Sequence, residues 1–263
     1  MKRVQLFFIL SLLFGFTSCA KWSKSEEDKN PYKDMSATQL YSAAQKSLKK
    51  KEYATAANQF EAMESMYPFS DYTEQSQMDL IYAYYKNEDY PSSAATAERF
   101  IHLYPRAKHV DYAYYMKALA NFQQTRGTFA KIFPMDESWR DPGTQTQAFV
   151  DFSVFLQKFP DSKYKANALQ RMIYLRNMYA QHELNVSYFY FKRKMYVAAI
   201  ERASYLIKTY PQAPCAQQAM AIMYQANQAL GLDKAAEDVA KVYQATYHTS
   251  TWVSIKPNPG FKF

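Results

Sequence analysis

Cys19 is the residue whose surroundings point most clearly to a chemical reaction. Two basic residues near the N-terminus precede the apolar run 4–16, which has the length of a signal-peptide core and is too short to span a bilayer as a helix. Thr17 and Ser18 supply the small residues that lipoprotein signal peptidase needs before the cysteine. We therefore expect the Cys19 thiol to carry diacylglycerol and residues 1–18 to be removed as a lipoprotein signal peptide.

The residues on either side of Cys19 suggest where the lipidated protein resides. Ala20 stands where an inner-membrane retention signal would place aspartate, so we expect a lipid anchor on the periplasmic side of the cell outer membrane. Phe16 stands where such signals usually carry leucine. That departure leaves ordinary cleavage and a soluble periplasmic protein as the alternative. Polar residues then dominate, and the segment 19–34 is predicted to be a flexible tether.

No group of residues predicts catalysis or metal binding. His182 and Glu183 begin a zinc-protease motif, but Val186 occupies the position of the second histidine ligand. The sequence contains no glycine-rich phosphate loop, no Gly-x-Ser-x-Gly elbow and no Cys/His cluster with metal-ligand spacing. Cys215 has no disulfide partner if Cys19 is acylated. We expect a protein that is not an enzyme and uses no cofactor and no metal.

Charge and composition favour a helical protein with a mildly basic surface. The net charge is +8 at pH 7, and removing Lys2 and Arg3 leaves 8 − 2 = +6. A surplus of this size suits an anionic membrane surface or an acidic partner, and we expect no nucleic acid. Only five glycines occur in 263 residues. This scarcity argues against a β-sandwich or a barrel, and the frequent alanine, glutamine and lysine favour helices.

A repeated spacing organises the chain. Four anchor residues each lie 15 positions before a proline, and the pairs are Tyr53/Pro68, Tyr90/Pro105, Gln145/Pro160 and Tyr196/Pro211. A small residue recurs three positions after each anchor, a large apolar residue ten positions after it, and an aromatic residue directly before each proline. Offsets of 3, 7, 10 and 14 follow one face of an α-helix, which the proline ends.

Each of these helices needs a preceding helix to cover its apolar face. Segments 38–50 and 74–86 supply such partners across short turns. A helix–turn–helix unit of about 34 residues with a proline near its end is the tetratricopeptide pattern. We predict an all-α fold, a right-handed α-α superhelix of about five tetratricopeptide-like helix pairs. The expected solenoid is 35–247, with units near 35–69, 73–106, 108–160, 163–211 and 213–247, an insertion at 126–145 and a mobile C-terminal tail at 248–263.

Binding is expected on the concave face of the superhelix, which the first helix of each pair lines. Seven residues fall on this face by their repeat position: Tyr41, Gln45, Met78, Tyr82, Tyr85, Tyr112 and Tyr115. Tyrosine rings and hydroxyls suit an extended peptide with alternating apolar and polar groups. Packing within a repeat explains about half of these tyrosines equally well. The insertion 126–145 either contacts a partner or only packs on its neighbours.

The lipid signal, the five repeats and an inserted Arg-Asp-Pro sequence together resemble the BamD family of outer-membrane lipoproteins. The resemblance extends from Cys19 to about Thr246. Its most specific stretches are 79–87, 99–105, 111–116, 140–142 and 159–164. The resemblance implies a non-catalytic scaffold in the β-barrel assembly (Bam) complex, which the repeat pattern alone does not indicate.

The resemblance also implies partners. Unfolded outer-membrane proteins would present their targeting strands to the first three repeats, and the last repeats would dock on the POTRA region of the barrel subunit BamA. Other Bam lipoproteins, such as BamC, would lie along the N-terminal half. Arg202 is similar to a family arginine at the BamA interface. Two other classes stay open, namely another tetratricopeptide lipoprotein scaffold for pilus or cell-wall assembly and an envelope enzyme with a solenoid arm.

Overall fold

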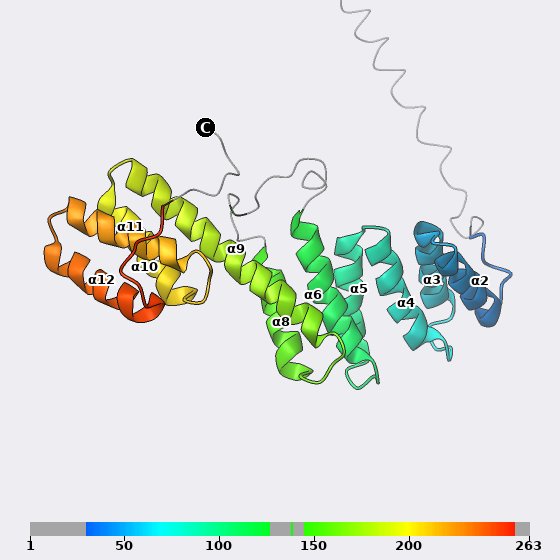
Figure 1. Cartoon of the computed structure of the whole chain (residues 1–263). Helices are drawn as coiled ribbons and strands as arrows, with labels where there is room; N and C mark the ends of the chain where they lie inside the picture. Colours follow the sequence, from blue (N-terminus) through cyan, green and yellow to red (C-terminus); the bar gives the residue numbers. More distant parts are fainter. Residues whose placement is uncertain (1–29, 127–137, 139–144, 256–263) are drawn as a thin grey trace, which may run out of the picture.

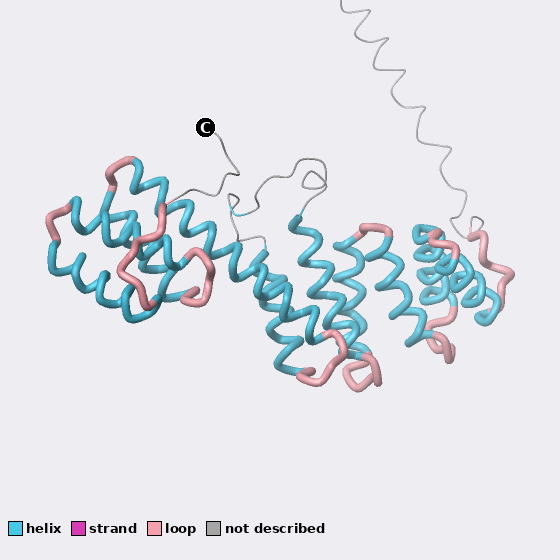
Figure 2. The backbone as a smooth tube through the Cα atoms, viewed as in Figure 1, coloured by secondary structure: helices cyan, strands magenta, loops and turns pink. Residues whose placement is uncertain are grey.

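The computed structural model describes residues 30–126, 138 and 145–255. Ten α-helices and no β-strand lie within these residues, and the helices follow one another in an elongated row (Figures 1 and 2). The five pairs are α2 (Ala37–Lys49) with α3 (Tyr53–Met66), α4 (Thr73–Lys86) with α5 (Tyr90–Leu103), α6 (Val110–Arg126) with α8 (Thr146–Lys158), α9 (Lys165–Lys192) with α10 (Tyr196–Thr209), and α11 (Ala216–Ala229) with α12 (Asp233–Tyr247). The predicted all-α superhelix of tetratricopeptide-like pairs is confirmed.

The residues at the repeated offsets form the contacts between helices. Two sets are fully buried, the small residues Ala56, Ser93, Ala148 and Ala199 and the large residues Met63, Phe100, Phe155 and Leu206. The small residues allow neighbouring helices to approach closely, and the large residues fill the grooves between them. The spacing in the sequence therefore identified the buried face of the second helix in four pairs.

The turns that join one pair to the next share one construction. In the first turn, the Ser70 amide donates to the Tyr67 carbonyl and the Thr73 amide donates to the Ser70 carbonyl. The same two bonds follow three other aromatic residues, Tyr104, Phe159 and Tyr210. A proline directly after each aromatic residue ends the preceding helix, because proline has no amide hydrogen for the ladder.

The turns inside the pairs use a residue with a left-handed backbone. Lys51, Glu88 and Lys194 have φ angles of 64°, 63° and 60°, and Gly231 has a φ of 70°. Glycine adopts this conformation freely, whereas a residue with a Cβ loses about 1 kcal/mol or more. In the third pair, the segment between α6 and α8 replaces this short turn.

The 28-residue helix α9 connects two hydrophobic cores. The first core includes Met78 on α4 and reaches Tyr179 on α9, and the second begins at Ala180 and includes Ile222 on α11. The boundary between the cores thus falls between adjacent residues of one continuous helix. A smaller cluster around Phe60 lies between the first pair and α4, which contributes Leu80 and Ala83. Helix α9 therefore contributes to both cores and connects the two halves of the solenoid.

Several expectations concern residues that the structure does not describe. They are the signal peptide 1–18, the lipidation site Cys19, the tether up to residue 29, the insertion apart from its ends and Ser138, and the tail from residue 256. In the described part of the tail, Trp252 is stacked on Tyr224 with ring centroids 4.4 Å apart. Within the described ranges, no helix has the length and apolar character needed to cross a membrane.

Candidate functional site

A groove of about 850 Å³ lies between α4, the turn that precedes α6 and the turn that precedes α9. Three of the seven residues predicted for the binding face line it, namely Met78, Tyr82 and Tyr112. The Met78 side chain is buried, whereas Tyr82 is 39% exposed and offers its ring to solvent. The Tyr82 ring also rests edge-on against Tyr53, with centroids 6.4 Å apart. The groove therefore combines an apolar floor with accessible aromatic surface.

Asp79 organises one wall of the groove. Its Oδ2 accepts hydrogen bonds from Gln45 Nε2 at 2.5 Å and from the Tyr41 hydroxyl at 3.3 Å, and its Oδ1 accepts one from Gln75 Nε2 at 3.1 Å. Burial raises the pKa of the Asp79 carboxyl, although these three donors oppose the shift. Tyr41 is also stacked on Tyr72, with centroids 4.7 Å apart. The predicted residues Tyr41 and Gln45 thus support the groove through a carboxylate that sequence reasoning missed.

Tyr164, at the end of the turn before α9, supports the opposite wall. Its ring is stacked on Tyr115 with centroids 4.6 Å apart and lies 5.8 Å from the Tyr112 centroid. The Tyr115 side chain is buried, and its hydroxyl donates to Asn167 Oδ1 at 2.9 Å. Burial also raises the pKa of Tyr112, so this phenol stays protonated at physiological pH. Tyr115 packs behind the wall, whereas Tyr112 and Tyr164 line the groove itself.

Tyr85 does not line the groove. Its ring packs against Tyr90 with centroids 5.5 Å apart, and its hydroxyl accepts a hydrogen bond from Gln123 Nε2 at 3.2 Å. These contacts join α4 to α5 and α6. Tyr85 is thus one of the predicted tyrosines that packing explains.

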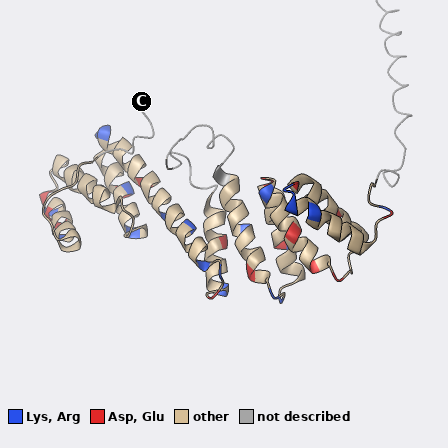
Figure 3. Cartoon of the chain, turned by 45° about the vertical axis from the view of Figure 1, so that its right-hand side comes forward, with Lys and Arg blue, Asp and Glu red and all other residues tan. Residues whose placement is uncertain are grey.

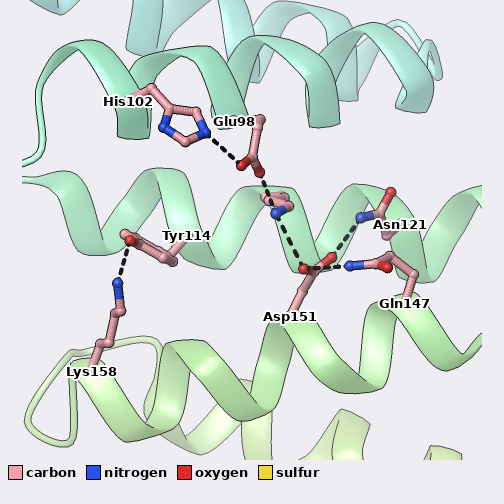
Figure 4. Close-up of polar contacts among 8 residues, drawn as sticks. Glu98, His102, Tyr114, Asn121, Gln147, Asp151 and Lys158 are labelled. Atoms are coloured by element: carbon pink, nitrogen blue, oxygen red, sulfur yellow. Dashed lines mark hydrogen bonds and ion pairs between the residues drawn. The ribbon is translucent and has the colours of Figure 1, made fainter.

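Charged side chains of both signs are also among the lining residues. The groove is lined by Lys108, Lys158, Lys163, Asp79, Asp111 and Asp161. Lys158 donates to the Tyr114 hydroxyl at 2.8 Å, as Figure 4 shows, and the Ser162 hydroxyl donates to Asp111 Oδ2 at 2.6 Å. None of these six residues was predicted for the binding face. Three of them, Lys108, Asp161 and Lys163, lie in turns between pairs, which the repeat pattern does not assign to that face. The aromatic–proline sequence that recurs in these turns was the signal that could have placed them along the same edge of the solenoid.

A network of polar side chains holds α5, α6 and α8 together next to the groove (Figure 4). Lys117 forms ion pairs with Glu98 on α5 and with Asp151 on α8, the latter with 3.3 Å between Nζ and Oδ1. Asn121 and Gln147 donate to the Asp151 carboxylate at 2.6 and 2.9 Å. Because Asp151 is only 6% exposed, the network satisfies a carboxylate that would otherwise be buried without partners.

Arg202 lies outside the groove, on α10. Its side chain is 49% exposed, and its Nη1 lies 3.3 Å from Oε2 of Glu183 on α9. The arginine is accessible to a partner but already has a carboxylate neighbour. Basic and acidic residues occur at both ends of the superhelix (Figure 3), so charge alone does not select one docking end.

The described residues include no cluster of three or more His, Cys, Asp or Glu side chains that would hold a metal ion. His182, the start of the incomplete zinc motif, instead has its Nδ1 2.9 Å from the Ser138 carbonyl oxygen. Asn185 donates to the Ser138 hydroxyl at 3.0 Å. His182 and Asn185 thus fasten one residue of the insertion to α9. Cys215 is buried, and burial raises the pKa of its thiol to about 11.

Comparison with known proteins identifies the family. The profile of the YfiO family, described as outer membrane lipoprotein, matches residues 33–242. Outer membrane protein assembly factor BamD of Vibrio cholerae is 40% identical over 235 residues, which cover 89% of this chain and 94% of that protein. BamD of Neisseria meningitidis is 33% identical over 97% of this chain and 94% of that protein, and BamD of Xylella fastidiosa is 33% identical over 96% and 85%. The chain therefore belongs to the YfiO family of outer membrane lipoproteins, together with these BamD proteins.

Proposed function

We propose that the protein is a non-catalytic scaffold of the Bam complex that binds the targeting strands of unfolded outer-membrane proteins in the groove between α4, α6 and α9. The observation that carries the proposal is the groove itself, which is lined by Tyr82 and Tyr112 together with lysine and aspartate residues. The names of the relatives, assembly factors of outer membrane proteins, support the same role.

The chemistry of the groove fits an extended segment better than a helix or a small molecule. A β-strand places alternate side chains on opposite faces, so every second residue of a targeting strand can face the tyrosines while the residues between them face the opposite wall. Tyrosine rings bind such residues with little loss of rotamer freedom, and charged side chains pair with polar positions. Asp79 and Lys158 each have partners within the chain, so their positions are set before a ligand arrives.

Fluorescence anisotropy with a labelled peptide from the C-terminus of an outer-membrane protein tests this proposal. Tyr82→Ala removes an exposed ring from the groove, and we expect the peptide to bind at least fivefold more weakly, which corresponds to about 1 kcal/mol. The matched control is Tyr205→Ala on α10, because Tyr205 is also exposed, at 49%, and lies outside the groove. Equal binding by the Tyr82 variant and the control would show that the groove is not the receptor.

The remaining contacts of the scaffold are part of the same proposal. Cys19 would carry the lipid anchor, the last repeats around Arg202 would dock on the POTRA region of BamA, and accessory lipoproteins such as BamC would bind the N-terminal half. Purification of the tagged protein from detergent-solubilised outer membranes, followed by mass spectrometry, tests these partners together. Recovery of a POTRA-bearing barrel in stoichiometric amount is expected. Recovery of pilus or cell-wall proteins instead would favour the other class of lipoprotein scaffold.

A further inference from the structure

The segment 249–255 packs on the C-terminal helix pair, away from the groove between α4, α6 and α9 (the α4 groove). Helix α12 ends at Tyr247, and the next residue, His248, caps it with a left-handed φ of 54° that turns the chain back. The segment then forms neither helix nor strand and crosses the last pairs, drawn in red in Figure 1. The surface beneath it is formed by α11, α12 and the second hydrophobic core.

The contacts of the segment define what this surface recognises. The Trp252 ring lies between Tyr224 on α11 and Tyr243 on α12, with centroid distances of 4.4 and 4.1 Å. Ile255, three residues later, packs on the second core. The surface thus has an aromatic slot followed by an apolar site for a branched side chain.

Tyr243 adds a polar contact to the aromatic slot. Its hydroxyl donates to the backbone carbonyl of Thr251 at 3.0 Å and accepts from Gln217 Nε2 at 2.8 Å. Tyr243 is 1% exposed, so this hydroxyl is shielded from water when the segment is bound. Because the bond is made to a main-chain carbonyl, any peptide that places its backbone here would accept the same bond.

We propose that this surface of α11 and α12 is a peptide-binding site for an extended segment of another polypeptide, one with an aromatic residue three positions before a branched aliphatic residue. Residues 249–255 of the same chain occupy this site and compete with such a segment for it. The occupant is inferred from the segment that the surface holds within the chain. The proposal goes beyond the strand-binding function of the α4 groove and does not depend on it, because the two sites share no residue.

Tethering explains why a modest set of contacts keeps the segment bound. A segment attached directly to α12 acts at an effective concentration in the millimolar range or above, so weak contacts suffice to fill the site. A peptide added in solution must compete with it, and its apparent affinity falls by the fraction of molecules whose site is open. Weakening the resident segment should therefore strengthen binding of a peptide from solution.

The test uses the whole chain and a labelled peptide with the sequence of residues 249–255, followed by fluorescence anisotropy. The variant Trp252→Ala with Ile255→Ala removes the two resident side chains, and we expect it to bind the peptide at least tenfold more tightly than the unchanged chain. Adding Tyr224→Ala to this variant should abolish the gain, whereas adding Tyr205→Ala should not. Adding Tyr82→Ala should also leave the tighter peptide binding unchanged, and this result would distinguish the site from the α4 groove.

A second variant keeps the proposal testable if loss of Trp252 unfolds α12. Ten Gly/Ser residues inserted after His248 retain every contact of the segment but lower its effective concentration, so peptide binding should again tighten. The proposal is overturned if neither variant, shown to be helical by circular dichroism, binds the peptide more tightly than the unchanged chain. Dimerisation of the unchanged chain that disappears in the double variant would also overturn it, because the segment would then be exchanged between copies.

Discussion

Lys117 Nζ on α6 lies 3.3 Å from Oδ1 of Asp151 on α8, so a cation and a buried carboxylate join the two helices of the third pair. The pair is also connected to α5, because Lys117 forms a second ion pair with Glu98. In this pair the short turn found in the other pairs is replaced by the insertion. The polar network therefore joins α6 to both α5 and α8 through side chains.

Loss of the Lys117 cation should destabilise the protein. Lys117→Met leaves the Asp151 carboxylate, 6% exposed, with amide donors only, and we expect the free energy of unfolding to fall by about 3 kcal/mol. Adding Asp151→Asn should recover part of the loss, because a neutral amide is less costly to bury. Urea denaturation measures both changes. The control Lys241→Met removes an exposed i,i+4 pair with Glu237 and should change stability by less than about 0.5 kcal/mol; equal effects of the two substitutions would contradict the prediction.

Glu98 should contribute to the stability of the protein in a way that is lost at acidic pH. The hydrogen bond and charge of Lys117 lower the pKa of Glu98 below its ordinary value of 4.5, against the effect of burial. A lowered folded-state pKa means that the stabilisation is complete above the unfolded-state pKa and is lost as the pH falls through the folded-state value. The difference in melting temperature between the unchanged chain and Glu98→Gln should therefore shrink below about pH 4.5. A difference that stays constant from pH 7 to pH 3 would show that Glu98 contributes no charge-dependent stability.

Substitutions at two of the left-handed turn residues should change stability in opposite directions. Lys194 has a φ of 60°, so Lys194→Gly should stabilise the protein by about 0.5–1 kcal/mol, since glycine takes this conformation without steric cost. Gly231→Ala should destabilise it by about 1 kcal/mol. Apart from the residue itself and its two chain neighbours, no heavy atom lies within 4 Å of the added Cβ, so the cost comes from the backbone conformation. Thermal unfolding measures both, and Lys241→Gly inside α12 serves as a control in which glycine destabilises. Destabilisation by Lys194→Gly would contradict the interpretation.

Substitution of Arg202 should weaken partner binding. This effect must be separated from the loss of its ion pair with Glu183. Arg202→Glu places two carboxylates side by side on α9 and α10, because Glu183 is the present neighbour of the arginine. We expect this reversal to reduce the amount of POTRA-bearing barrel that co-purifies with the protein. Glu183→Gln removes the internal pair and keeps the arginine, so it should leave co-purification unchanged. An equal loss with both variants would attribute the effect to the α9–α10 contact and not to an interface.

Regular spacing explains which parts of the fold the sequence predicted well. A helix buries positions on one face at a period of 3.6 residues, so small and large residues such as Ser93 and Phe100 could be assigned to helix contacts from their spacing alone. Proline and the aromatic residue before it marked where the second helix of four pairs ends. Helix α9 extends without interruption from Lys165 to Lys192, and its sequence contains no glycine or proline.

The groove was predicted less completely, because its parts are far apart along the chain. The repeat pattern placed Met78, Tyr82 and Tyr112 at the site, but it also selected Tyr85, which packs between helices. Asp79 meets Tyr41 across 38 positions of sequence, and no local pattern reports such a contact.

The sequence by itself determined the helix pairs, their buried faces and the resemblance to a lipoprotein family, since these depend on local periodicity and short motifs. Only the tertiary structure decided that Asp151 is neutralised by Lys117 and that Trp252 is stacked on Tyr224. Burial of a charge or an aromatic ring depends on which surfaces, far apart in the sequence, come into contact. Many packing contacts along the superhelix together determine those surfaces.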